Sequence, residues 1–249
     1  MLSDPSSPRV LVVVPAWNEQ DSVGSVVHQV ARVDPTMDVL VVDDGSGDST
    51  SANAGASGAL VCRLPFNLGV GGAMRAGYRY ALRNGYDVVV QVDGDGQHDA
   101  RYIPQLVAAL ATADVVVGAR FAGEGAYAAR GPRRWAMQVL ATVLSRLARR
   151  RLSDVTSGFR AVNRRGIRLF ATHYPAEYLG DTVESLVIAL RTGCRVTQIP
   201  VSMRVRASGK PSQSTFRAVL YLARAMVALG LALVRRWPTT LETVPQELT

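Results

Sequence analysis

The sequence predicts an α/β domain built on a mostly parallel sheet that is flanked by helices. Through the first 120 residues, short apolar runs alternate with segments of helical periodicity. Polar residues gather where the apolar runs end. A chain of 249 residues, 48% of them hydrophobic, is long enough to bury a large core.

Continuous apolar runs predict the strands, because such runs are typical of strands buried on both faces. The predicted strands cover residues 9–14, 38–42, 59–64, 87–92 and 114–117. Helical spacing predicts helices over residues 20–33, from about 48, 69–83 and 104–111. Right-handed crossovers would then place the loop after each strand at one edge of the sheet, where such sheets bind ligands.

The pattern changes after Phe121. Small and glycine residues over 122–129 predict a mobile loop. Beyond it we expect a basic amphipathic helix over residues 133–151 and a turn with a strand over 154–162. A helix over 181–191 and a further strand over 195–206 follow. A last helix over 215–236 is apolar nearly all round, and Pro238 ends it.

The chain is basic, with a net charge of +8, and Lys210 is its one lysine. Arginine grips phosphate with a planar fork, so this composition favours a partner that carries phosphate. A genome biased toward arginine would give the same composition. No aromatic and basic stripe or recognition motif accompanies the charge, so we do not expect nucleic acid as a partner.

Two cysteines, Cys62 and Cys194, have neither metal-ligand spacing nor a disulfide framework, which favours a reducing cytoplasm. The N-terminus lacks the features of a signal peptide. No run of about 18 apolar residues predicts a transmembrane helix. The basic and apolar helices over 133–151 and 215–236 instead predict a peripheral protein at the inner face of the plasma membrane. Packing within the domain, a membrane protein partner or a second copy of the chain are the alternatives.

Two carboxylates stand two positions apart at the end of a predicted buried strand, in Asp93-Gly94-Asp95-Gly96-Gln97. Oxygen ligands in that spacing suit Mg²⁺ or Mn²⁺, or one carboxylate contacts the cation and the other a ribose. A D-x-D sequence alone is more often an ordinary acidic turn. The position after a buried strand favours the metal site.

Two further loops are candidates for the same ligand. Asp43 and Asp44 follow the second strand, where adjacent carboxylates need a hydrogen-bonding partner such as a ribose or base edge, while Asp48 caps the next helix. The glycine-rich stretch 67–73 is a poor dinucleotide-binding loop, because Met74 replaces its last glycine and the stretch follows the third strand. It predicts close packing of helix on sheet, or a helix start near a diphosphate.

Five short motifs follow one another along the chain: Pro15-x-Trp17-Asn18-Glu19, Asp43-Asp44-Gly45-Ser46, Asn67-x-Gly69, Asp93-x-Asp95-x-Gln97-His98 and Ser157-Gly158-Phe159-Arg160. Residues 9–212 thereby resemble family 2 glycosyltransferases, and within them the dolichyl- or polyprenyl-phosphate mannosyl- and glucosyltransferases. The resemblance implies a GT-A fold, a nucleotide-sugar donor, a divalent cation, Mn²⁺ or Mg²⁺, and inversion at the sugar carbon.

The resemblance also implies roles for individual residues. The nucleotide-sugar would be held by Pro15, Asn18, Glu19, Asp43, Asp44, Asn67, Gly71 and Asp93. The metal ligands would be Asp93, Asp95 and Gln97. Phosphates of donor or acceptor would meet Arg120, Ser157, Arg160, Arg206 and Lys210. The chain departs from the family pattern at two positions. Trp17 is a mild departure, because it stands where the family usually has another aromatic residue, and Gln213 stands where the family has lysine.

The implied organisation is a GT-A domain over 1–212, with a nucleotide-sugar half at about 9–120 and an acceptor half at about 121–212, then a membrane- or partner-associated helix and tail over 213–249. The leading function is transfer of a hexose from a GDP- or UDP-sugar to a polyprenyl phosphate. The second candidate function is transfer to a glycan hydroxyl. A third is a non-catalytic scaffold that binds nucleotide-sugar, and the complete D-x-D-x-Q motif argues against it, because a scaffold would not need that motif.

Acid–base chemistry depends on the acceptor. An ionised lipid phosphate needs no general base, whereas a hydroxyl would need one. Asp181 and Glu184, at the head of a predicted helix, are the candidates, and Asp181 joins Asp93 and Asp95 in the expected catalytic set. Acidic residues in a first turn also favour the helix dipole, which is the alternative for both.

Overall fold

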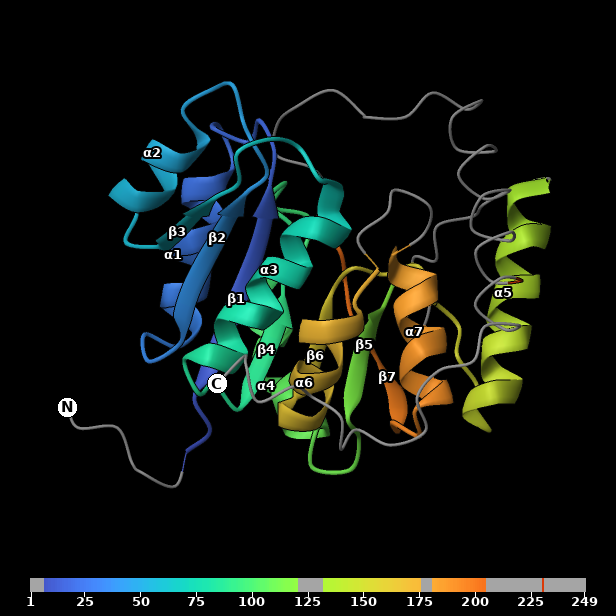
Figure 1. The fold of residues 1–249 in the computed structure, drawn as a ribbon. Coiled ribbons are helices and arrows are strands. Elements are labelled where there is room, and N and C mark those ends of the chain that lie inside the picture. The colour runs from blue at the N-terminus through green and yellow to red at the C-terminus, as the bar shows by residue number, and fades with distance from the viewer. Residues whose placement is uncertain (1–6, 121–131, 176–180, 205–229, 231–249) are drawn as a thin grey trace.

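The computed structural model describes residues 7–120, 132–175, 181–204 and 230. Its centre is a 7-stranded sheet with the strand order β3-β2-β1-β4-β6-β5-β7. Helices lie on both sides of this sheet (Figure 1). The predicted α/β class, with a mostly parallel sheet between helices, is confirmed.

The strands run parallel to one another except for β6, which is antiparallel to both of its neighbours, β4 and β5. They are β1 (Val10–Ala16), β2 (Asp38–Asp43), β3 (Leu60–Arg63), β4 (Val88–Gln91), β5 (Val115–Ala119), β6 (Arg160–Asn163) and β7 (Val196–Pro200). The carboxyl ends of β1, β2, β4 and β5 therefore meet at one edge of the sheet.

Two layers of helices bury the apolar residues of the sheet. The helices are α1 (Val23–Val33), α2 (Thr50–Ala56), α3 (Gly69–Arg83), α4 (Ile103–Ala109), which follows a short 3₁₀ turn η1 (Ala100–Tyr102), α5 (Pro132–Ala148), α6 (Arg164–His173) and α7 (Asp181–Arg191). Side chains of α3, α5, α6 and α7 share one core cluster with the sheet, and those of α1, α2 and α4 share the other. Most of these helices bury an apolar stripe against one sheet face, whereas α5 packs against α7.

The structure adds one helix, α6, that is not among the predicted elements. Asn163 caps it by accepting a hydrogen bond from the backbone amide of Gly166 at 3.1 Å, and Ile167, Leu169 and Phe170 are buried. The strand predicted over 195–206 is shorter, because β7 ends at Pro200.

Several expectations fall outside the described residues. They are the loop over 122–129, the contacts of Arg206 and Lys210, and the last helix over 215–236, of which the structure describes Gly230 alone. Among the helices that the structure describes, none is long and apolar enough to span a membrane.

Candidate active site

The loop after β4 carries Asp93, whose side chain is 40% exposed. The Asp93 amide donates to Nδ1 of the buried His98 at 3.0 Å, and the Gln91 amide nitrogen lies 3.3 Å from Asp93 Oδ1. A Cβ built on Gly158 would lie 3.1 Å from the same Oδ1, so the segment before β6 approaches this carboxylate closely. Asp93 is thus partly open to solvent but fixed from three sides.

Asp95 and Gln97 complete the loop and are both half-buried. Asp95 Oδ1 accepts from the Gln97 amide at 3.0 Å, and the Gln97 carbonyl accepts from the Arg204 amide at 2.9 Å. The carboxylates and the amide oxygen are hard donors, which fit Mg²⁺ or Mn²⁺. The described part of the chain holds no group of three His, Cys, Asp or Glu side chains that could cage a metal. A cation here would therefore need further oxygen ligands from a phosphate group or water.

The loop after β1 is held by the loop after β2. Asn18 has a φ of 55°, which asparagine tolerates better than most residues. Its amide donates to Ser46 Oγ at 2.9 Å, its Oδ1 accepts from the Gly47 amide at 3.0 Å, and the Glu19 amide donates to Thr50 Oγ1 at 2.9 Å. Pro15 lies within β1 itself, where its carbonyl faces the D-x-D loop at Gly94.

Asp43 and Asp44, at the end of β2, are both buried. Asp43 accepts from the Ser46 amide at 2.8 Å and from the Ser51 hydroxyl. Burial alone would raise the pKa of Asp43, but these hydrogen bonds outweigh it and the pKa lies below its ordinary value. The expected ligand contact is not open to this carboxylate as it stands, because it organises its own loop.

Asp44 joins β2 to the beginning of α3. Its two carboxylate oxygens accept from the backbone amides of Leu68 and Gly69, each at 2.7 Å. Burial raises the pKa of Asp44, with these two hydrogen bonds opposing the shift. The glycine-rich stretch therefore begins a helix that a carboxylate caps, with Asn67 directly before it and Gly71 buried in its first turn. Asp48 accepts from the Thr50 amide at 2.9 Å. It lies one residue before the N-cap of α2, which is Ser49 and not the predicted Asp48.

The acceptor half contributes Arg120, which directly follows β5. Asp154, whose side chain is 0% exposed, accepts from Arg120 Nε at 2.7 Å and from Arg120 Nη2 at 3.0 Å. The Asp154 carbonyl in turn accepts from Gln198 on β7 at 2.7 Å. Ser157 is buried, and its hydroxyl accepts from the Phe159 amide at 3.3 Å.

Arg160 is the largest fully buried side chain of the described residues and is 2% exposed. It donates to the Ser157 carbonyl at 2.7 Å and to Ser185 Oγ at 2.8 Å. The phosphate contact implied for Arg160 is therefore not available in this structure. The guanidinium instead ties the segment before β6 to α7.

Asp181 is the first residue of α7, with Glu184 in the same turn. Its Oδ2 is buried and has no hydrogen-bond partner among the residues that the structure describes. Burial raises the pKa of Asp181, while the charge of Arg160 opposes the shift and that of Asp93 adds to it. Asp181 is half-buried as a residue and feels the charge of Asp93 in the D-x-D loop, but its Oδ2 is not exposed to solvent.

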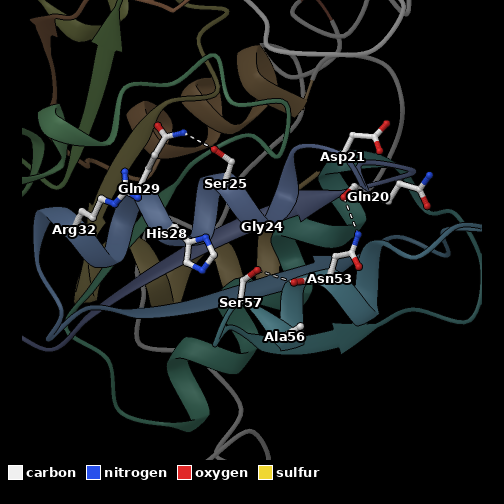
Figure 2. A pocket seen from close by; sticks show the side chains of 10 residues that line it. All are labelled: Gln20, Asp21, Gly24, Ser25, His28, Gln29, Arg32, Asn53, Ala56 and Ser57. Carbon is white, nitrogen blue, oxygen red and sulfur yellow. Dashed lines mark hydrogen bonds between the residues drawn. The ribbon is translucent and has the colours of Figure 1, made fainter.

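A shallow groove of about 470 Å³ runs along α1 and α2. Figure 2 shows its polar lining, with hydrogen bonds from Gln29 to Ser25 and from Asn53 to the Gln20 carbonyl. Its lining residues are Gln20, Asp21, Gly24, Ser25, His28, Gln29, Arg32, Asn53, Ala56 and Ser57. None of these is a predicted site residue, so the groove is separate from the D-x-D loop.

The structure gives positions to residues for which the sequence assigned no role. His98 and Gln91 flank Asp93, and Asp154 fixes Arg120. A sequence signal exists for Gln91, because it is a polar residue that interrupts an apolar run, and the structure buries it. His98 stands in the Asp93-x-Asp95-x-Gln97-His98 motif, which places it in the same loop as its partner Asp93. Asp154 carries no comparable signal, since its partner Arg120 comes from another segment.

Comparison with known proteins agrees with this arrangement. Residues 11–170 match the model of glycosyl transferase family 2. The chain is 33% identical over 218 residues to undecaprenyl-phosphate mannosyltransferase of Micrococcus luteus, covering 83% of this chain and 88% of the relative. It is 30% identical over 224 residues to polyprenol monophosphomannose synthase of Mycolicibacterium smegmatis, covering 86% and 84%.

Among solved structures, the fold is similar to glucosyl-3-phosphoglycerate synthase from Mycobacterium tuberculosis in complex with Mn²⁺, uridine diphosphate and phosphoglyceric acid. That similarity has a TM-score of 0.69 at 21% identity and covers 93% of this chain and 81% of the other. At this identity it bears on the fold, which is of the GT-A type. From the family match and the relatives together, the chain belongs to glycosyl transferase family 2.

Proposed function

We propose that this protein transfers a hexose from a nucleotide-sugar to a polyprenyl phosphate, with inversion at the sugar carbon. The observation that carries the proposal is the D-x-D-x-Q loop at the end of the buried strand β4, facing the same sheet edge as Arg120. The names of the two relatives, an undecaprenyl-phosphate mannosyltransferase and a polyprenol monophosphomannose synthase, support a lipid-phosphate acceptor.

On the donor side, Asp93, Asp95 and Gln97 would hold a divalent cation. When bound, Mn²⁺ or Mg²⁺ supplies Lewis-acid stabilisation of the leaving nucleoside diphosphate. Asn18 and Glu19 would bind the nucleoside from the loop after β1. Pro15, Asp43, Asp44, Asn67 and Gly71 would shape that side, with Asp44 acting through the position of α3.

On the acceptor side, Arg120 would orient the lipid phosphate. Its guanidinium is held by a buried carboxylate, yet the side chain is 31% exposed and can reach a ligand. Arg206 and Lys210 are expected to add phosphate contacts, and Ser157 to support the same segment. Arg206→Ala should raise the KM for the acceptor far more than the Kd for nucleotide, and equal changes in both would reject that assignment.

The proposed reaction is a single displacement. An ionised phosphate oxygen of the acceptor attacks the anomeric carbon as the bond from that carbon to the diphosphate oxygen breaks. The electron pair of that bond leaves with the nucleoside diphosphate. A phosphate oxygen is already deprotonated near neutral pH, so the step needs no general base.

The test is direct. The protein is incubated with Mn²⁺, a panel of GDP- and UDP-sugars and a short polyprenyl phosphate, and lipid-linked sugar is measured. We expect product with at least one donor, and at least ~10²-fold slower formation of it with the matched Asp95→Asn variant. Product on a glycan hydroxyl but not on the lipid phosphate would favour the second candidate, for which the half-buried Asp181 is the candidate base.

We further propose that residues 215–236 contact the inner face of the plasma membrane. Their sequence is apolar nearly all round, and Arg217, Arg235 and Arg236 flank it. Each arginine near an anionic surface contributes about 1 kcal/mol. The intact protein should float with anionic liposomes at low salt, and deletion after Ser214 should abolish flotation without loss of donor binding. A soluble monomer that never floats would refute this contact.

A further inference from the structure

His98 has two contacts with one residue. Its Nδ1 accepts a hydrogen bond from the Asp93 amide at 3.0 Å, and its Nε2 lies 3.5 Å from Asp93 Oδ2. Because Nδ1 is the acceptor, the neutral ring carries its proton on Nε2, the atom that faces the carboxylate. The imidazole thus hydrogen-bonds the backbone of Asp93 and lies beside its carboxylate, at a distance longer than a hydrogen bond.

The ring itself is fixed. The His98 side chain is 3% exposed and stacks on Phe159, with the ring centroids 4.8 Å apart and the planes inclined by 14°. Its backbone forms an isolated antiparallel bridge with Met203, after β7. Phe159 belongs to the segment before β6, so the orientation of His98 depends on the acceptor half of the domain.

The Asp93 carboxylate is flanked on its other side as well. Gln91, a polar residue buried at the end of β4, donates to Oδ1 at 3.3 Å, while His98 approaches Oδ2. Both oxygens thereby have a neighbour that restricts rotation of the side chain, although it is 40% exposed. Groups that hydrogen-bond a ligating carboxylate orient it and strengthen metal binding.

We propose that His98 is a positioning residue that presents the Asp93 carboxylate to the divalent cation and the donor. The proposal rests on the proposed function, in which Asp93 is a metal ligand. A purely structural histidine would need its Nδ1 contact to the loop backbone but not the approach of Nε2 to the carboxylate. The two roles use different ring nitrogens and can be separated.

Two substitutions separate them. In His98→Asn the amide oxygen can take the place of Nδ1 and keep the backbone contact, but nothing replaces Nε2. In His98→Gln the amide nitrogen can take the place of Nε2, but the acceptor at Nδ1 is lost. His98→Asn should therefore damage metal binding more than the loop, and His98→Gln should damage the loop more than metal binding.

The measurement is Mn²⁺ affinity in the presence of GDP or UDP, followed by the electron paramagnetic resonance signal of free Mn²⁺. We expect His98→Asn to bind Mn²⁺ about 10-fold more weakly than wild type, as found when outer-shell partners are removed, and His98→Gln to lie nearer wild type. His28→Asn, at an exposed histidine of α1, is the matched control and should not change the affinity.

Wild-type affinity in His98→Asn, or a larger loss in His98→Gln than in His98→Asn, would overturn the positioning role. If His98→Asn does not fold, the comparison of His98→Gln with His98→Ala decides, and equal losses in these two would overturn it. Asp93→Asn tests the underlying site separately. If that variant binds Mn²⁺ like wild type, the proposed metal site fails. If Asp93→Asn binds weakly, adding His98→Asn to it should cause no further loss, because interacting residues are not additive.

Discussion

The buried Asp154 carboxylate forms a bidentate ion pair with the Arg120 guanidinium, at 2.7 Å to Nε and 3.0 Å to Nη2. The pair joins the end of β5 to the loop before β6. Burial alone would raise the pKa of Asp154, but the hydrogen bonds and charge of Arg120 outweigh burial, and the pKa lies below its ordinary value. Asp154 is therefore ionised in the fold and depends on Arg120.

Asp154→Asn should lower the free energy of unfolding by about 2–3 kcal/mol, because the variant loses the bidentate ion pair with Arg120. Urea denaturation measures the change. The control is Asp87→Asn, whose carboxylate is 39% exposed and lies 3.3 Å from Arg164. That variant should change stability by less than about 1 kcal/mol. Similar losses of unfolding free energy in the two variants would show that the buried Asp154–Arg120 pair stabilises the fold no more than an exposed pair.

The same carboxylate predicts a pH dependence. Its pKa in the folded state lies below the ordinary value of 3.8, so its contribution to stability is present above that value and is lost as the pH falls through the folded pKa. The free energy of unfolding of wild type should decline as the pH falls below about 4. Asp154→Asn should decline with a smaller slope over that window, measured by urea titrations at stepped pH. An unchanged slope would contradict the assignment.

The fold was largely predictable because local periodicity determines most of its elements. The helix Gly69–Arg83 and the strands before and after it follow directly from apolar spacing. Helix α6 was not predicted, although Asn163 caps it and Ile167, Leu169 and Phe170 bury one face. Its first turn lacks an acidic residue and contains Gly166, which has poor helix propensity. Insertion of β6 between β4 and β5 depends on pairing between distant segments, which periodicity does not encode.

For the candidate site, the sequence predicted where the polar residues lie in the fold, but not all of their contacts. The motifs correctly placed polar residues at strand ends, but they did not reveal which carboxylates the fold already uses. Asp44 was expected to face a ligand, yet its partners are the amides of Leu68 and Gly69, which only the packing of β2 beside β3 brings near. Arg160 was likewise expected at a phosphate and is buried against α7. Both contacts are non-local, so spacing in the sequence could not predict them.

Gly158→Ala should impair the metal site without disrupting the sheet. A Cβ at this position would lie 3.0 Å from Gln91 Nε2, 3.1 Å from Asp93 Oδ1 and 3.2 Å from Asp93 Oδ2. The methyl group would displace the Asp93 side chain, so we expect Mn²⁺ affinity and kcat each to fall by about 10-fold. Gly47→Ala is the control, because a Cβ there meets nothing within 4 Å. Equal behaviour of the two variants would remove Gly158 from the site.

Turnover should need a divalent cation held through Asp95. Asp95→Asn should reduce kcat by at least ~10²-fold, as expected when a preorganised charge contact is lost. Excess EDTA should abolish turnover of wild type, and added Mn²⁺ should restore it. Asp87→Asn, directly before β4 at the opposite end of the same strand, should keep full turnover. Full activity in EDTA would rule out the cation requirement.

Asp181 distinguishes the two candidate acceptors, because an ionised phosphate needs no base and a hydroxyl does.

Burial raises the pKa of Asp181 above its ordinary value of 3.8, with Arg160 opposing the shift. The fold therefore disfavours the ionised carboxylate, which lowers stability at neutral pH, and stability is regained as the pH falls through the raised pKa. Asp181→Asn should accordingly raise the urea midpoint at pH 7 relative to wild type.

With polyprenyl phosphate as acceptor, we expect the kcat of Asp181→Asn to stay within about 10-fold of wild type, since removal of a general base costs about 10²–10⁴-fold. The pH profile of kcat should keep its shape, because no essential proton transfer to Asp181 is removed. Asp95→Asn, assayed in parallel, provides the scale of a severe defect. A loss of about 10²-fold or more in Asp181→Asn on this acceptor, together with loss of the acidic limb of the profile, would assign Asp181 as a base and contradict the base-free displacement.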